Sequence, residues 1–271
     1  FALTGGILTA IGIAFWIAIG IFGISFAEKP LPPSVGILMM DNLGKQEDDF
    51  WAKGITGDLI IKIASSGNIR VSSMKEILSI NINDSFENIA ERLNVKYILT
   101  SEIYKKDNEF ELRSQLINTD TGISEYANKW IEKNENAANI INSLADQLLE
   151  KIAPNFQNTS YDKVINSESY AYYLKGKSYG GAFTNYKNIS SEELSLAREL
   201  LSKAIKLDST NIDAQIQLAR TYIMYLENLD NTIHLLKNSV RLCKIYDKEK
   251  ELGRVYRNIG LAEFRKWGRG K

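Results

Sequence analysis

The chain opens with a long stretch that carries no charge. Residues 1–27, FALTGGILTAIGIAFWIAIGIFGISFA, contain no Asp, Glu, Lys or Arg. As a helix rising about 1.5 Å per residue, this stretch is longer than the roughly 30 Å hydrocarbon core of a bilayer. It predicts one transmembrane helix. A secretory signal peptide is the alternative, although the apolar region of such a peptide is usually shorter and ends in a small-x-small cleavage site.

Small residues recur along this apolar stretch. Gly6, Ala10, Ala14 and Ala18 follow one another at intervals of four, which places them on one face of a helix. Such a face lets a second helix approach closely, so the pattern predicts helix packing in the membrane and a homodimer. The alternative is that a span rich in Gly and Ala produces this row by accident.

The composition argues against several functions. The 33 basic and 33 acidic residues balance, so no overall field favours nucleic acid as a partner. Cys243 is the only cysteine and His234 the only histidine. The chain therefore has no internal disulfide or cysteine-rich zinc site, and we expect no Ser-His-Asp triad. We expect no catalytic residue.

Residues 34–154 alternate strand and helix patterns after a proline-rich linker, residues 28–33. Predicted strands cover residues 34–43, residues 69–73 and three segments within residues 95–133. Predicted helices run from Phe50 to near Gly67, over residues 83–94 with Asp84 or Ser85 as the cap, and over residues 137–154. This order predicts an α/β (α+β) domain with a mixed sheet, not a regular doubly wound fold.

Five carboxylates precede or enter the first predicted helix: Asp41, Glu47, Asp48, Asp49 and Asp58. Their spacing matches neither a calcium-binding EF-hand loop nor a glycine-rich phosphate loop. Acids at the start of a helix interact favourably with its dipole, by about 0.3–1 kcal/mol each. We therefore expect an architectural role for them, with no metal and no cofactor bound.

Two segments of this region carry a family resemblance. SVGILMMDNLGKQEDDFWAKGITGDLIIKIASSGNIRVSS and IAERLNVKYILTSEIYKKDNEFELRSQLINTDTGISEYANKW resemble the TolB amino-terminal-like domain. Families with this domain include membrane-bound bacterial adenylate cyclases, serine/threonine kinases and winged-helix regulators. The resemblance covers residues 33–154 and implies a sensory or protein-contacting module without catalytic activity.

Beyond a polar linker, residues 155–166, the periodicity is purely helical. Residues 167–271 repeat a helix-turn-helix pattern with a period of about 34 residues, and they resemble tetratricopeptide repeats. The matching positions are Gly176, Tyr179, Ala197, Leu201 and Ala204, then Leu218, Ala219, Tyr222, Thr232, Leu236 and Ser239, then Ile259 and Gly260. Ser209 replaces the usual proline, and a longer loop follows the first helix.

The repeat resemblance implies a solenoid that binds a protein or peptide. We expect Tyr172, Tyr179, Gln215 and Tyr222 to contact the ligand, and Cys243 to be a packing residue. The alternative is a helical extension without a partner.

These features together predict a non-catalytic, membrane-anchored sensor or scaffold. Because the sequence begins at Phe1 and stops within a repeat, we expect it to be a piece of a longer bacterial protein. The family resemblance implies a missing cytoplasmic cyclase, kinase or DNA-binding domain, which would place the soluble part in the periplasm. An envelope assembly or secretion accessory protein is the alternative, and an enzyme built on the mixed sheet is a weaker one.

Overall fold

A computed structural model describes residues 32–67, 69–133, 136–154, 166–181 and 189–269. The predicted membrane span, with Gly6, Ala10, Ala14 and Ala18, lies outside these residues, and so does nearly all of the two predicted linkers. No helix in the described ranges is both long and apolar enough to cross a bilayer.

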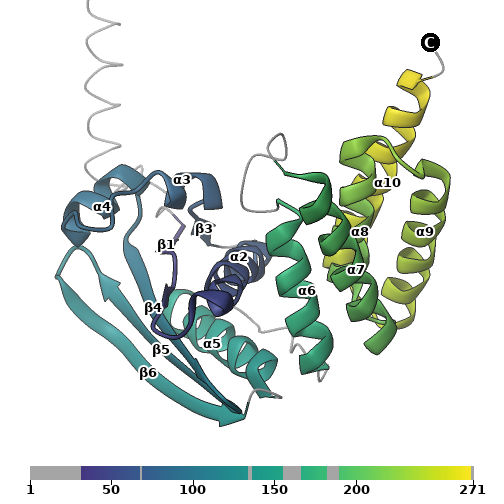
Figure 1. The fold of residues 1–271 in the computed structure, drawn as a ribbon. Coiled ribbons are helices and arrows are strands. Elements are labelled where there is room, and N and C mark those ends of the chain that lie inside the picture. Colours follow the sequence, from purple (N-terminus) through teal and green to yellow (C-terminus); the bar gives the residue numbers. More distant parts are fainter. Residues whose placement is uncertain (1–31, 68, 134–135, 155–165, 182–188, 270–271) are drawn as a thin grey trace, which may run out of the picture. The chain divides into compact units, whose positions relative to one another are not determined.

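The sheet is mixed, as the order of elements predicts (Figure 1). Its main path is β3 (Arg70–Val71), β1 (Ser34–Ile37), β4 (Tyr97–Lys106), β5 (Glu109–Asn118) and β6 (Ile123–Lys133), and β2 (Asp41–Asn42) also pairs with β4. Strand β1 pairs in parallel with β3 and β4, and β2 pairs in parallel with β4. The pairs β4–β5 and β5–β6 are antiparallel. The antiparallel part corresponds to the three predicted segments within residues 95–133.

The predicted first strand, residues 34–43, is broken into β1 and β2. Between them the backbone N–H of Met40 donates to the hydroxyl of Thr56, at 3.1 Å. That hydroxyl donates in turn to the carbonyl of Ala52, at 2.8 Å. A side chain of the following helix thus replaces a strand partner, which the apolar run by itself does not show.

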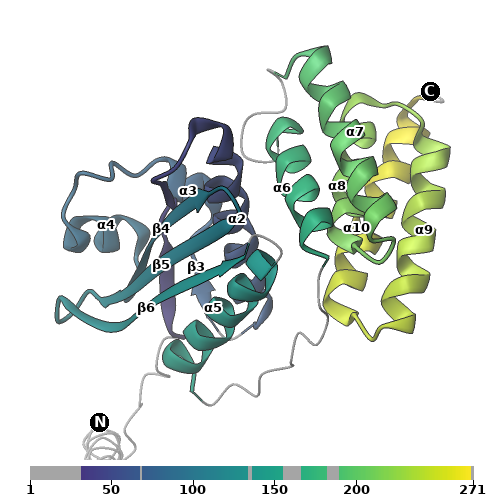
Figure 2. The ribbon, with the colours of Figure 1, turned by 60° about the horizontal axis from the view of Figure 1, so that its bottom comes forward.

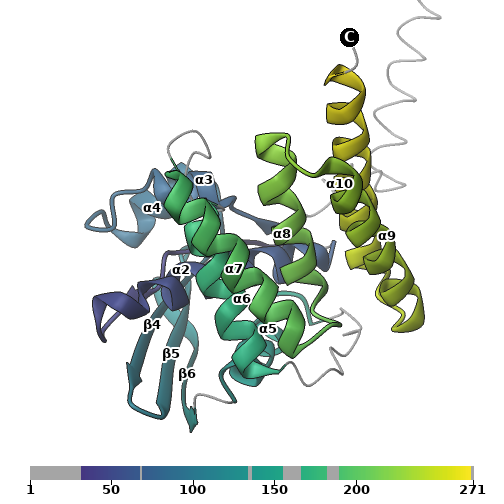
Figure 3. The same cartoon turned by 45° about the vertical axis from the view of Figure 1, so that its right-hand side comes forward.

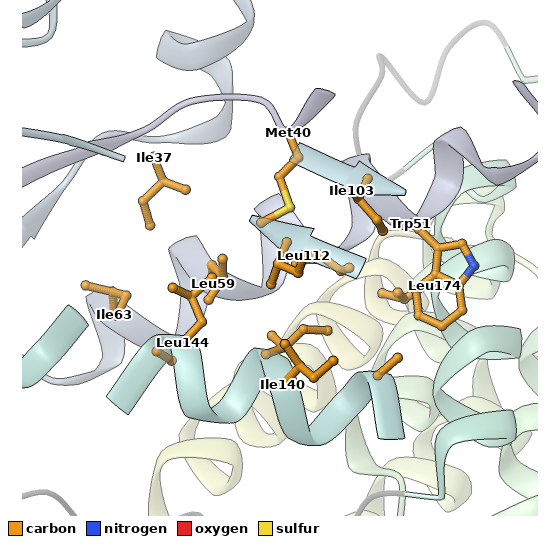
Figure 4. Packing of buried hydrophobic residues seen from close by; sticks show 14 of the residues in the cluster. Ile37, Met40, Trp51, Leu59, Ile63, Ile103, Leu112, Ile140, Leu144 and Leu174 are labelled. Atoms are coloured by element: carbon orange, nitrogen blue, oxygen red, sulfur yellow. The ribbon is translucent and has the colours of Figure 1, made fainter. Parts of the chain in front are cut away.

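Helices cover both faces of the sheet. On one face, α2 (Asp49–Ser65) and α5 (Ala137–Ile152) contact the sheet strands, and their buried side chains form a core with residues such as Ile103 and Leu112 (Figure 4). The buried side chain of Ile98 points to the opposite face, where α4 (Phe86–Leu93) contributes Ile89 and Leu93. Figure 2 shows α2 and α5 together beside the strands. The central strands are therefore buried on both sides.

Serine caps define two of the smaller helices. Ser85 accepts from the backbone of Asn88 and caps α4, which confirms one of the two predicted caps. Ser73 and Glu76 form a capping box that starts α3 (Met74–Leu78). The sequence prediction missed α3, because five residues are too few to show a helical period.

The C-terminal part is helical. It consists of α6 (Ser167–Tyr179), α7 (Ser191–Leu207), α8 (Ile212–Tyr225), α9 (Leu229–Ile245) and α10 (Glu249–Arg269). Ser190 and Glu193 make a capping box at the start of α7. Helices α8, α9 and α10 share a hydrophobic cluster and pack side by side (Figure 3). This shows successive packed helices, whereas a tetratricopeptide solenoid remains a prediction.

Candidate functional site

A single carboxylate on α2 accepts three hydrogen bonds from α6. The hydroxyls of Tyr170 and Tyr173 donate to Asp58 at 2.9 and 3.0 Å, and the ammonium of Lys177 donates at 2.5 Å. Because these donors are three and four residues apart, they share one face of α6. We call these four residues the Asp58 cluster. It joins the sheet-bearing part of the chain to the helical part.

Glycine allows α2 and α6 to approach closely at this point. Gly54 lies one turn before Asp58, and a Cβ atom placed there would be 2.7 Å from Cδ2 of Leu174. The indole of Trp51 also lies near the ring of Tyr170, with 6.3 Å between centroids. Trp51 and Leu174, both labelled in Figure 4, belong to the same buried hydrophobic cluster. The short distance between the helices places the Asp58 carboxylate within reach of all three donors.

The cluster is shielded from water. The side chains of Lys177 and Asp58 are 6% and 14% exposed. An ion pair at this depth is costly to desolvate, but the tyrosine hydroxyls supply further hydrogen bonds to the carboxylate. Removing either charge would leave the other in a poorly hydrated place.

Further charges of alternating sign lie around the cluster. Asp213 on α8 pairs with Arg254 on α10 at 2.6 Å. Desolvation acts to raise the pKa of Asp213, but Arg254 and Lys177 outweigh it and lower that pKa. Desolvation also lowers the pKa of Lys62 on α2, although the nearby carboxylates of Asp58 and other acids oppose this change. Charges from four helices therefore interact here.

The chemistry of this arrangement is that of a structural contact. Burial first, and then the charge of Asp58, raise the pKa values of Tyr170 and Tyr173, so both phenols stay protonated donors at neutral pH. The carboxylate already accepts three donors, and no serine or cysteine is among them. Within the ranges that the structure describes, no group of three or more His, Cys, Asp or Glu residues is arranged to hold a metal ion.

The raised tyrosine pKa values predict a loss of stability in alkali. A group whose pKa is higher in the folded state contributes stability below its unfolded pKa, about 10 for tyrosine, and this contribution is lost as pH rises toward the folded value. We expect the urea midpoint to fall more steeply above about pH 10 in the natural chain than in a Tyr170→Phe, Tyr173→Phe double variant. If the urea midpoint fell equally with pH in both proteins, the raised pKa values would not belong to these two tyrosines.

The acidic loop before α2 makes separate local contacts. Asp48 pairs with Lys105 on β4 at 3.6 Å, and Asp49 accepts from the amide of Asn42 at 2.7 Å. Asp49 is also the acid in the first turn of α2, as expected. Asp58, in contrast, lies in the middle of the helix, so the dipole does not explain it.

The predicted ligand-contacting residues lie at different helix interfaces. Tyr172 is near Lys203, with 5.9 Å from ammonium to ring centroid, and Tyr222 stacks on Arg198 at 4.1 Å. Gln215 is 1% exposed and accepts a hydrogen bond from Ser239 at 2.6 Å. Tyr179 is half-buried in the last turn of α6. The structure does not bring the four together, and their role in binding remains a prediction.

Sequence reasoning missed the residues that matter most here. Tyr170, Tyr173 and Lys177 were not among the residues expected to form a site. The spacing Tyr170-x-x-Tyr173-x-x-x-Lys177 does align three donors on one helix face. The spacing does not reveal the acceptor, because Asp58 is more than a hundred residues earlier in the chain.

Comparison with known proteins gives distant similarities. No family model matches the chain. A putative adenylate cyclase 3 from Rhizobium meliloti (strain 1021) is 22% identical over 192 residues, which are 67% of this chain and 31% of the cyclase. The chain thus spans about a third of that relative's length.

Two solved structures match part of the chain. TolB from Acinetobacter baumannii has 15% sequence identity and a TM-score of 0.36, covering 45% of this chain and 28% of TolB. The LpoB C-terminal domain from Escherichia coli has 20% identity and a TM-score of 0.30, covering 40% of this chain and 87% of that domain. These partial likenesses include the predicted resemblance to TolB, whereas the comparisons show no tetratricopeptide repeats.

Proposed function

We propose that the chain is a non-catalytic protein-binding module of a bacterial envelope protein. The observation that carries this proposal is the Asp58 cluster, which ties α6 to α2 with three hydrogen bonds. Such a tie holds the helical array in a defined position on the sheet-bearing part, as a scaffold requires. The envelope location rests on the uncharged stretch of residues 1–27 and on the resemblance to the TolB domain.

Two versions of this role differ in what else the polypeptide carries. In the first, the module is an accessory of envelope assembly or secretion. In the second, it is the periplasmic part of a signal transducer, which the similarity to part of a putative adenylate cyclase favours. A coding region upstream of Phe1 that specifies a cyclase, kinase or DNA-binding domain would support the second version. A signal peptide alone would support the first.

Photo-crosslinking in the bacterium that makes the protein tests the binding role. A photoreactive residue replaces Tyr179 on α6 in one strain and Lys129 on β6, which is 47% exposed, in a control strain. We expect a discrete crosslinked protein from the Tyr179 position and none from the Lys129 position. Identical products from both positions, or none from α6, would contradict the proposal.

A further inference from the structure

Helix α10 carries a row of large exposed side chains. Tyr256, Leu261, Phe264 and Trp267 are 49%, 38%, 66% and 61% exposed. Tyr256, Gly260, Phe264 and Trp267 follow one another at steps of four, four and three, which places them on one helix face. An apolar face of this size on a soluble helix usually marks a contact surface. We call Tyr256, Gly260, Phe264 and Trp267 the α10 face.

The opposite side of α10 is buried against neighbouring helices. Val255 and Ala262 are fully buried in the cluster shared with α8 and α9. On the α10 face, in contrast, a Cβ atom added at Gly260 would meet no atom within 4 Å. Among the residues that the structure describes, nothing therefore packs closely against Gly260.

Helices α6 and α8 also carry a small residue at the position that corresponds to Gly260. In both of them the next helix covers that position. A Cβ atom at Gly176 of α6 would lie 2.8 Å from Cγ of Leu201 and 3.1 Å from the carbonyl oxygen of Ala197, both on α7. Ala219 of α8 is fully buried in the cluster that also contains Leu236 of α9. In both cases the small residue lets the next helix pack closely. The α10 face is the next surface in the same series of interfaces.

The covering helices have a common pattern. α7 presents Ala197, Leu201 and Ala204, which are all fully buried, and α9 presents Thr232, Leu236 and Ser239, which are at most 2% exposed. Each series is a small residue, a leucine four positions later and a second small residue three positions after that. We infer that the α10 face is a docking surface for an amphipathic helix with this spacing. The inference concerns another face than the proposed function does, and it stands without that function.

A tethered probe tests this inference. The full chain, in detergent micelles, is extended after Lys271 by about ten Gly/Ser residues and a copy of residues 229–245, with Cys243 of the copy changed to Ala. The tether gives the copied helix a high effective concentration. In a matched control fusion, the copied Leu236 is changed to Lys.

We expect the fusion to cover Trp267. Its fluorescence emission should shift to shorter wavelength, and the melting temperature should rise by at least about 2 °C, relative to the control fusion. Trp267→Phe should remove the spectral shift, which assigns it to this residue. Gly260→Leu should abolish both effects in the fusion. In the unextended chain Gly260→Leu should leave the melting temperature equal or higher, because its site is open and leucine favours helix over glycine.

Two results would overturn the inference. One is a fusion whose emission and melting temperature equal those of the control fusion, or do not respond to Gly260→Leu. The other is an unextended chain that sediments as a dimer and becomes a monomer on Phe264→Ser, since a second copy would then occupy the α10 face.

Discussion

Replacing Asp58 with alanine should lower the free energy of unfolding by about 3–5 kcal/mol, the usual cost of breaking a buried ion pair. The variant removes the carboxylate from beside the Lys177 ammonium, which is only 6% exposed, and it removes the acceptor of two tyrosine hydroxyls. Urea denaturation followed by circular dichroism measures the change. The loss should be larger than that from a typical single substitution, which is about 1 kcal/mol.

A matched control separates burial from charge. Asp230 also pairs with a lysine, Lys266, at 2.5 Å, but its side chain is 77% exposed. Water screens such a pair, so Asp230→Ala should leave the urea midpoint nearly unchanged. If Asp58→Ala were as mild as Asp230→Ala, the Asp58 cluster would not hold α6 to α2.

Introducing leucine at Gly176 should separate α6 from α7. The first added carbon already lies 2.8 Å from Leu201 Cγ and 3.1 Å from the backbone of α7, so the helix itself must move. Overpacking of this kind costs about 1–3 kcal/mol or more, despite the better helix propensity of leucine. The melting temperature of the purified chain measures the effect.

Gly253 provides the comparison for this substitution. It is also a helix glycine, on α10, but a Cβ atom there meets nothing within 4 Å. Gly253→Leu should therefore be neutral or slightly stabilising. A loss of stability at Gly253 equal to that at Gly176 would mean that helix packing does not decide the cost at Gly176.

Local signals predicted most of the secondary structure. Ser85 was one of two caps expected for α4, and it is the cap that the structure shows. The turn residues divided the long β region into three strands. Such signals act over a few residues, so a sequence shows them directly. The break between β1 and β2 was not predicted, because it depends on a hydrogen bond from Met40 to Thr56 sixteen residues later.

The candidate site could not be predicted in the same way. Asp58 was grouped with the acids before α2, yet its partners are on a helix more than a hundred residues later in the chain. Tyr172 and Tyr222 were expected to contact a ligand, and the structure places both beside basic side chains of α7. A contact between side chains of two helices that are far apart in the chain leaves no periodic pattern in the sequence of either helix.

The sequence by itself determined most of the elements: which longer segments are helices or strands, where several of them begin, and that the sheet is mixed. It did so because helix and strand periods, caps and turns are properties of neighbouring residues. Only the tertiary structure decided that Gly54 lets α6 approach α2, and that Asp58 then meets Tyr170, Tyr173 and Lys177. The reason is that a buried charge acquires its role from whichever partners the fold brings to within hydrogen-bonding distance.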